Sequence, residues 1–301
     1  MGLFADGASD LTPKRGRGNA PSNIRGDGPW AARILLATST NGLEFVRLHY
    51  IISDQADAPN VIVDREGRAR IYYSDFGNGN VLACAIQERA GSLTNWIYRR
   101  VHVLGRPEDY PNHPVHHSVV TLSDGRYRFY FASAAMASSI YSAISSNGVE
   151  FVKEDGVRFN AGREDLSGLT LLRTPKSWWL WCGGEGCFST RSADGLNFTG
   201  AEEFRVEGAR FMPRSAVTLP NDGGYRLYGN FVGAGEWSGG ISSVTSRDGE
   251  NWQREAGIRL SLDGSRYSLE SHLTPGNGCA LLPDGRWLMA YVAAIPRPRG
   301  R

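Results

Sequence analysis

The feature that most constrains this chain is a short motif that recurs four times along it. The motif reads Ser, any residue, Asn or Asp, Gly, two further residues and an aromatic residue, and it occupies residues 39–45, 145–151, 192–198 and 246–252. Successive copies begin 106, 47 and 54 residues apart, and residues 81–88 stand as a degenerate copy within the first interval. This period predicts a repeat architecture rather than the two domains that 301 residues would otherwise suggest.

Each copy has the composition of a tight turn between two strands. Asn-Gly or Asp-Gly supplies positive φ angles, the polar side chains bond nearby backbone amides, and the aromatic residue is expected to pack under the turn. A second pattern, which is an apolar strand, a turn and an alternating aromatic-rich strand, recurs at residues 61–73, 119–131, 169–181, 216–228 and 280–291. Period-two alternation of this kind predicts strands.

A unit of about 50 residues with four antiparallel strands is one blade of a β-propeller. The C-terminal segment, near residues 279–293, supplies the first two strands of a blade, and the N-terminal segment, near residues 32–50, supplies the last two. We therefore predict an all-β, five-bladed propeller over residues 30–301, closed by N- and C-terminal strands that share one blade. Residues 1–29 are rich in Gly, Pro and Arg and are predicted to be a flexible arm.

Composition excludes several classes of protein. The chain is 41% hydrophobic and 21% charged, which indicates a folded chain, and its net charge of +2 argues against nucleic-acid binding. There is no apolar run of membrane-spanning length and no signal-peptide pattern, so we expect a cytoplasmic protein without a membrane partner. The four cysteines are expected to be reduced and buried, with a disulfide between Cys182 and Cys187 as the alternative.

The repeated turn resembles the Asp box of sialidase-type propellers. Five blades with strands such as residues 116–131 are similar to the furanosidase-like glycoside hydrolase superfamily, which includes families 43, 32 and 130. The resemblance covers about residues 30–295 and implies a carbohydrate-active hydrolase. In such propellers the Asp box lies on the blade exterior, so it implies no catalytic role.

Ligands of propellers usually bind where the innermost strands begin, at one mouth of the central channel. The resemblance implies an acidic base or nucleophile there in the first full blade, which Asp57 matches, and a general acid in the third, which Glu164 or Asp165 matches. Glycoside hydrolysis needs such a pair, one carboxyl group protonated and the other ionised. His116 and His117 stand where the second blade of the family carries an Asp.

Histidines are the second cluster of candidate site residues. His113, His116 and His117 lie within five residues, and His272 precedes the inner strand of the last blade. With Glu270 or Asp165 they would suit a divalent metal ion, and alone they would suit a general base near neutral pH; structural roles are the alternative.

Candidate ligand contacts lie at the same approaches to the inner strands. Arg214 could hold an anionic group through its guanidinium fork, and Asn60 and Glu270 are placed to contact a ligand. Tyr110 and Trp237 could stack on a sugar, with packing between blades as the alternative.

Three functions follow as hypotheses. The first is a glycoside hydrolase that acts through paired carboxylates. The second is an enzyme of small-molecule or natural-product metabolism that uses the histidines, and the third is a propeller that binds carbohydrate without catalysis.

Overall fold

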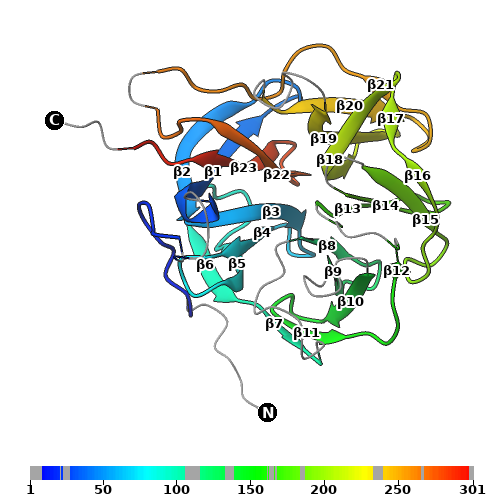
Figure 1. Cartoon of the computed structure of the whole chain (residues 1–301), viewed down its shortest axis with the longest axis horizontal. Helices are drawn as coiled ribbons and strands as arrows, with labels where there is room; N and C mark the ends of the chain where they lie inside the picture. Colours follow the sequence, from blue (N-terminus) through cyan, green and yellow to red (C-terminus); the bar gives the residue numbers. More distant parts are fainter. Residues whose placement is uncertain are drawn as a thin grey trace.

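The computed structural model describes residues 9–20, 22, 28–105, 116–132, 139–160, 162, 166, 168–183, 187–232, 240–265 and 268–297. These residues form five small sheets arranged in a ring, with one short 3₁₀ helix at Gly28–Ala31 (Figure 1). The prediction of an all-β, five-bladed propeller is therefore confirmed.

The blades are numbered from the shared one, with strands given from the axis outward. Blade 1 contains β22 (Leu273–Leu281), β23 (Trp287–Ala294), β1 (Ala32–Ser39) and β2 (Val46–Asp54), and blade 2 contains β3 (Ala56–Val63), β4 (Ala69–Asp75), β5 (Val81–Gln87) and β6 (Trp96–Arg100). Blade 3 contains β8 (His117–Thr121), β9 (Tyr127–Ala132), β10 (Ser139–Ser145) and β11 (Glu150–Lys153), with β12 (Phe159–Asn160) on β10 and β7 (His102–Leu104) parallel to β11. Blade 4 contains β13 (Thr170–Arg173), β14 (Trp178–Cys182), β15 (Phe188–Ser192) and β16 (Thr199–Glu203). Blade 5 contains β18 (Ala209–Thr218), β19 (Tyr225–Val232), β20 (Ser242–Ser246) and β21 (Gln253–Arg254), with β17 (Arg205–Val206) beside β18.

The ring closes through blade 1, as the sequence predicted. β1 pairs with β23 over its whole length, from Ala32 opposite Ala294 to Ser39 opposite Trp287. The two strands are almost entirely buried and come from opposite ends of the chain. Closure therefore depends on apolar strands of matched length.

The repeated motif forms the hairpin turn between the third and fourth strands of blades 1, 3, 4 and 5. In the first copy the Ser39 hydroxyl accepts a hydrogen bond from Gly42 N, and Asn41 Oδ1 accepts from the two amides that follow Gly42. The other three copies repeat this arrangement. The degenerate copy is β5 itself, so blade 2 lacks this turn.

These turns also fasten each blade to its neighbour. A tyrosine of the preceding blade donates its hydroxyl hydrogen to the carbonyl of the turn glycine in three of the four copies: Tyr72 to Gly148, Tyr130 to Gly195 and Tyr228 to Gly42. The motif's aromatic residue packs edge-on against the same tyrosine. In the fourth copy Trp252 packs edge-on against Trp181 instead. The aromatic residue thus packs between blades as well as beside its own turn.

The described part of the N-terminal segment, residues 9–20, lies against blades 1 and 2. Leu11 is buried in their shared core, and the Lys14 carbonyl accepts a hydrogen bond from Asp54 N. Arg17 donates to the carbonyl of Ile295, just beyond β23. These contacts hold the segment beside the closing blade, while flexibility of the rest of residues 1–29 stays a prediction.

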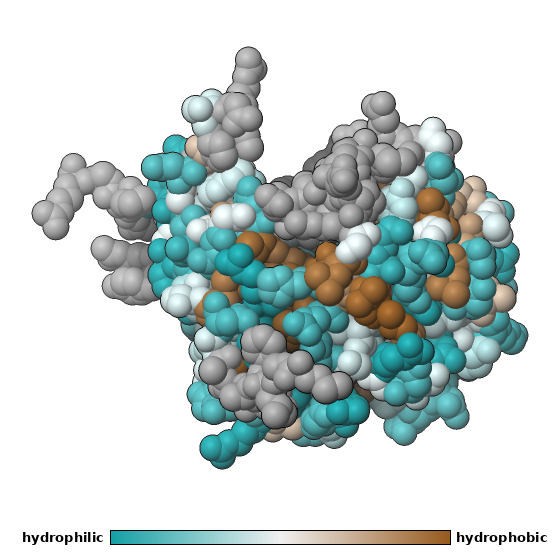
Figure 2. All heavy atoms as spheres, turned by 90° about the horizontal axis from the view of Figure 1, so that it is seen from below, coloured by the Kyte–Doolittle hydropathy of each residue, from teal (hydrophilic) through white to brown (hydrophobic). Residues whose placement is uncertain are grey.

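The structure also describes the cysteines and part of the molecular surface. The four cysteines are buried and form no disulfide with one another. Figure 2 shows apolar side chains gathered among hydrophilic ones on one side of the ring, and Leu104 and Val152 are exposed neighbours on the paired strands β7 and β11. Within the described residues, no helix has the length and apolarity needed to cross a membrane.

The hydrogen bond between Tyr228 of blade 5 and Gly42 of blade 1 predicts how the loss of one hydroxyl group changes the stability of the fold. Tyr228→Phe removes the hydroxyl that reaches the buried Gly42 carbonyl at 2.8 Å, so we expect the free energy of unfolding to fall by about 1–3 kcal/mol in denaturant titration. Tyr50→Phe is the control because its hydrogen bond to Thr94 is exposed, and it should change stability by less than about 0.5 kcal/mol. Equal effects of the two variants would contradict a stabilising role for the turn contact.

Candidate functional site

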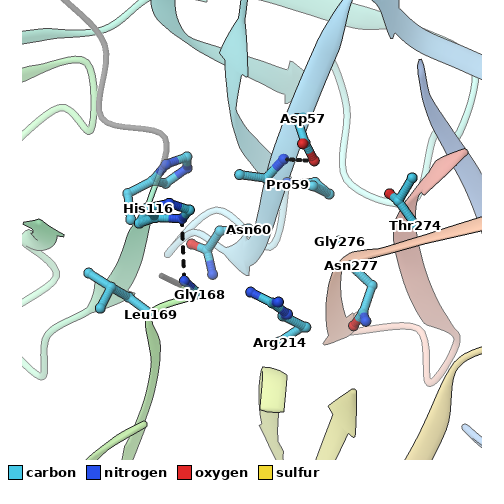
Figure 3. Close-up of a pocket in the computed structure, with 12 residues that line it drawn as sticks. Asp57, Pro59, Asn60, His116, Gly168, Leu169, Arg214, Thr274, Gly276 and Asn277 are labelled. Carbon is cyan, nitrogen blue, oxygen red and sulfur yellow. Dashed lines mark hydrogen bonds between the residues drawn. The ribbon is translucent and has the colours of Figure 1, made fainter. Parts of the chain in front are cut away.

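The five inner strands enclose a central channel. A cavity of about 410 Å³ is lined by residues of β3, β8, β13, β18 and β22. Toward the end where these strands begin lies a smaller pocket of about 170 Å³. Its lining includes Asp57, Asn60, His116, His117, Gly168, Leu169, Arg214, Thr274, Gly276 and Asn277 (Figure 3). Segments from all five blades thus meet at the predicted mouth.

Bulges in three inner strands aim side chains at this pocket. The pairing register shifts between Asp57 and Asn60 in β3, between Pro213 and Ser215 in β18, and between Leu273 and Asn277 in β22. Each irregular stretch contains a proline: Pro59, Pro213 or Pro275. Because proline has no N–H to donate to a ladder, it favours such interruptions, and a bulge redirects the side chains around it.

Among the described residues that line the small pocket, Asp57 is the acidic one. Its Oδ1 accepts a hydrogen bond from Ala58 N at 2.6 Å, and Ala58 has a positive φ of 55°, which is uncommon for a residue other than glycine. Burial raises the pKa of Asp57, and this effect outweighs the Ala58 hydrogen bond and the positive charge of Arg214, which both lower it. The backbone therefore holds a carboxyl group with a raised pKa at the channel mouth.

Arg214 and His116 meet at Gly168. Gly168 has φ of 66°, which strains a side-chain-bearing residue, and a Cβ at this position would displace the Arg214 guanidinium from the place it occupies. Gly168 N donates to His116 Nδ1 at 3.3 Å, as the dashed line in Figure 3 shows. A ring nitrogen that accepts carries no proton, so His116 is in the neutral tautomer with its proton on Nε2.

His117, the first residue of β8, is buried and stacks on Phe129 with ring centroids 5.6 Å apart. Asn60 Oδ1 accepts a hydrogen bond from Val119 N at 2.9 Å, which joins blade 2 to blade 3. The carbonyl end of the Asn60 amide is thus used by the fold. Its NH₂ end remains for the pocket.

Asn277 is the most buried polar residue of the pocket, with 2% of its surface exposed. Neither its Oδ1 nor its Nδ2 has a hydrogen-bond partner among the residues that the structure describes. Burying an amide without hydrogen-bond partners costs the free energy of its hydration. Asn277 therefore destabilises the fold at this position.

A second, larger pocket of about 790 Å³ shares Asp57 and Thr274 with the first. Its other lining includes His272 from blade 1, Arg17 from the N-terminal segment and Arg297 from the C-terminal end. Asp57 therefore lies between two pockets, one in the channel mouth and one against the chain ends.

The structure brings Asp57, Asn60, His116, His117 and Arg214 together, while His272 lines only the second pocket. Glu270 lines neither pocket, because its buried carboxylate accepts hydrogen bonds from Arg47 Nε at 3.0 Å and from Asp263 N at 2.7 Å. Its position gives the predicted ligand contact no support. The remaining candidates, Glu164, Asp165, Tyr110, Trp237 and His113, lie outside the described residues.

The predicted metal site gains no support from the described side chains. Across that part of the chain, no group of three or more His, Cys, Asp or Glu residues is placed to hold a metal ion. The bond from Gly168 also occupies one lone pair of His116. A site that includes His113 stays a prediction.

Sequence reasoning did not select Gly168, Thr274 or Asn277 as site residues. The signal that could have found Thr274 and Asn277 is proline within an apolar inner strand, because it marks a bulge. Gly168 had no such signal, since its role depends on Arg214 of the next blade.

Comparisons with known proteins agree with the propeller fold. No family model matches the chain, and no curated protein sequence matches it. An N-acetylgalactosamine deacetylase from F. plautii, solved with blood group B trisaccharide, is 14% identical with a TM-score of 0.55, covering 76% of this chain and 75% of its own. An α-L-arabinofuranosidase of family 43 from Clostridium thermocellum is 17% identical with a TM-score of 0.55, covering 78% and 81%.

A third structure comes from family 130, described as mannoside phosphorylases that include glycoside hydrolases targeting β-1,2 mannosidic linkages in Candida mannan. It is 13% identical with a TM-score of 0.54, covering 81% of this chain and 87% of its own. The chain therefore has the five-bladed fold of furanosidase-like glycoside hydrolases, as the sequence resemblance implied. At these identities the likeness establishes the fold alone.

The raised pKa of Asp57 predicts how stability depends on pH. The folded protein binds this proton more tightly than the unfolded chain, so Asp57 makes stability fall as pH rises above about 4. We expect Asp57→Asn to have a higher melting temperature than the wild type at pH 7, with the difference narrowing toward pH 4. A variant that melts lower than the wild type at pH 7 would show that the ionised carboxylate is stabilised.

The unpartnered amide of Asn277 gives a second stability prediction. Asn277→Leu removes two unsatisfied polar atoms, so the free energy of unfolding should rise by about 1 kcal/mol in denaturant titration. Asn230→Leu is the matched control, because Asn230 Nδ2 donates to the Gly240 carbonyl at 2.8 Å and its loss should destabilise the fold. Destabilisation of both variants by the same amount would mean that Asn277 has a structural role.

Proposed function

We propose that the protein is a carbohydrate-active enzyme of the glycoside hydrolase type that acts at this channel mouth. The observation that carries the proposal is the position of Asp57, the carboxylate shared by both pockets in the described lining. A ligand that spans the two pockets places the bond between its units beside Asp57. The channel-mouth pocket, at about 170 Å³, is smaller than typical ligand pockets of roughly 300–1,000 Å³ and suits a single terminal unit.

In this proposal Asp57 is the base or nucleophile. Its Oδ1 is held by Ala58 N, which fixes the carboxylate's orientation toward the reacting carbon or water. Burial raises its pKa and so increases the basicity of the carboxylate, while the charge of Arg214 favours the ionised form that the reaction needs.

The proposed general acid is Glu164 or Asp165. These residues precede Gly168 in sequence by four and three positions, and four residues of extended chain span at most about 14 Å. Gly168 itself lines the small pocket. Chain length therefore allows a second carboxyl group to serve the same bond, as hydrolysis through paired carboxyl groups requires.

His116 takes the place where the resemblance implies an aspartate. Because its Nδ1 accepts from Gly168, we assign it a donor's role toward a ligand or the acid, not that of a base. A neutral donor in this position does not raise the pKa of a nearby acid as a second carboxylate would.

The proposal predicts a large loss of activity on removal of one charge. Against a panel of aryl furanosides and pyranosides, Asp57→Asn should lower kcat/KM of the substrate turned over by about 10²–10⁴-fold. Asp284→Asn is the control, since that carboxylate is ion-paired with Arg286 at a surface hairpin, and its activity should match the wild type. Glu164→Gln and Asp165→Asn, assayed beside them, identify the acid.

Other outcomes separate the alternatives. Saccharide binding without turnover of any glycoside would favour the propeller that binds carbohydrate without catalysis. Turnover that persists in Asp57→Asn but is lost in His116→Ala would favour the histidine-based enzyme of small-molecule metabolism. Full activity of Asp57→Asn on a glycoside would contradict the proposed mechanism.

A further inference from the structure

We infer that the small pocket binds an oxyanion group of its ligand, held by Arg214 and Asn60. The inference rests on the proposed function for the identity of the ligand as a saccharide, but its binding chemistry follows from the pocket itself. The shared chemistry is a negatively charged oxygen group, either the carboxylate of an acidic sugar or free inorganic phosphate.

Hydrogen-bond donors converge on one side of the small pocket. Asn60 gives its carbonyl oxygen to Val119 N, so the amide offers its NH₂ end to the pocket. Arg214 has only donors, and His116, whose Nδ1 accepts from Gly168, is a donor at Nε2. In Figure 3 the Asn60 amide and the Arg214 guanidinium point toward the same space beside Gly168. A cluster of donors is complementary to an acceptor-only group such as an oxyanion.

The fold also makes room for the Arg214 side chain at this pocket. Gly168 leaves the space that a Cβ would take from the Arg214 guanidinium. The bulge at Pro213 and Ser215 turns Arg214 out of the ladder of β18 and toward the axis, where it lines both the pocket and the channel cavity. A long cationic side chain that borders two cavities is placed to meet a ligand.

The test compares sugars that differ in one group. Wild-type protein is titrated calorimetrically at low salt with glucuronate and glucose, with galacturonate and galactose, and with inorganic phosphate. We expect at least one acidic sugar to bind about tenfold to a hundredfold more tightly than its neutral counterpart, or phosphate to bind by itself. Arg214→Met should abolish this preference.

Arg210→Met is the matched control. Arg210 lies on the same strand, but it is half-buried, lines neither pocket and is ion-paired with Glu203, so its loss should leave the preference intact. Arg214→Lys keeps the charge but loses the planar fork, so it should weaken carboxylate binding more than phosphate binding and thus separate the two sources. Thermal unfolding of each variant confirms that it is folded.

Neutral sugars that bind as tightly as acidic ones would overturn the inference, as would a preference that survives in Arg214→Met or the absence of binding by every anion. Arg214-dependent anion binding without turnover of any glycoside would leave the inference standing and remove the proposed function. Turnover of neutral glycosides without anion preference would support the proposed function and overturn the inference of an oxyanion site.

Discussion

The pairing of β1 with β23 is the constraint on which the rest of the molecule depends. It joins strands from the two ends of the chain within blade 1 and so closes the ring of five sheets. This pairing also borders the site, since Ala32 and Ala294, which face each other across it, line the pocket that contains Asp57. Asp57 itself lies on β3, the strand that follows blade 1 in the chain. Closure and the candidate site are therefore parts of one structure.

The outer turns and the inner strands of the ring have different sequence requirements. At the periphery, the repeated turns keep a nearly constant sequence because each must satisfy its own amides and receive an aromatic residue from the neighbouring blade. Around the axis, the inner strands differ from one another, with proline bulges in blades 1, 2 and 5 and histidines at the start of blade 3. Repetition of the outer parts fixes the geometry, and this permits the inner parts to specialise.

The sequence predicted what short-range patterns determine. Turn chemistry and alternation fixed the blade number and the shared blade, and the start of each inner strand located Asp57, Asn60, His116 and Arg214 at one mouth. It could not predict the role of Glu270, whose partner Arg47 is 223 residues away in the chain. It also missed the space that Gly168 leaves for Arg214, because that contact joins two blades and has no local signature.

The pKa of Asp57 depends on the positive charge of Arg214. Burial raises the pKa of Asp57, and the positive charge of Arg214 opposes this shift. Removing or neutralising that charge would leave burial unopposed and raise the pKa of Asp57 further. An oxyanion bound to Arg214 would have this effect on the occupied site, so ligand binding would itself increase the basicity of the carboxylate. Ligand recognition and the reactivity of Asp57 would then be linked through a single guanidinium, the one that lies beside Gly168.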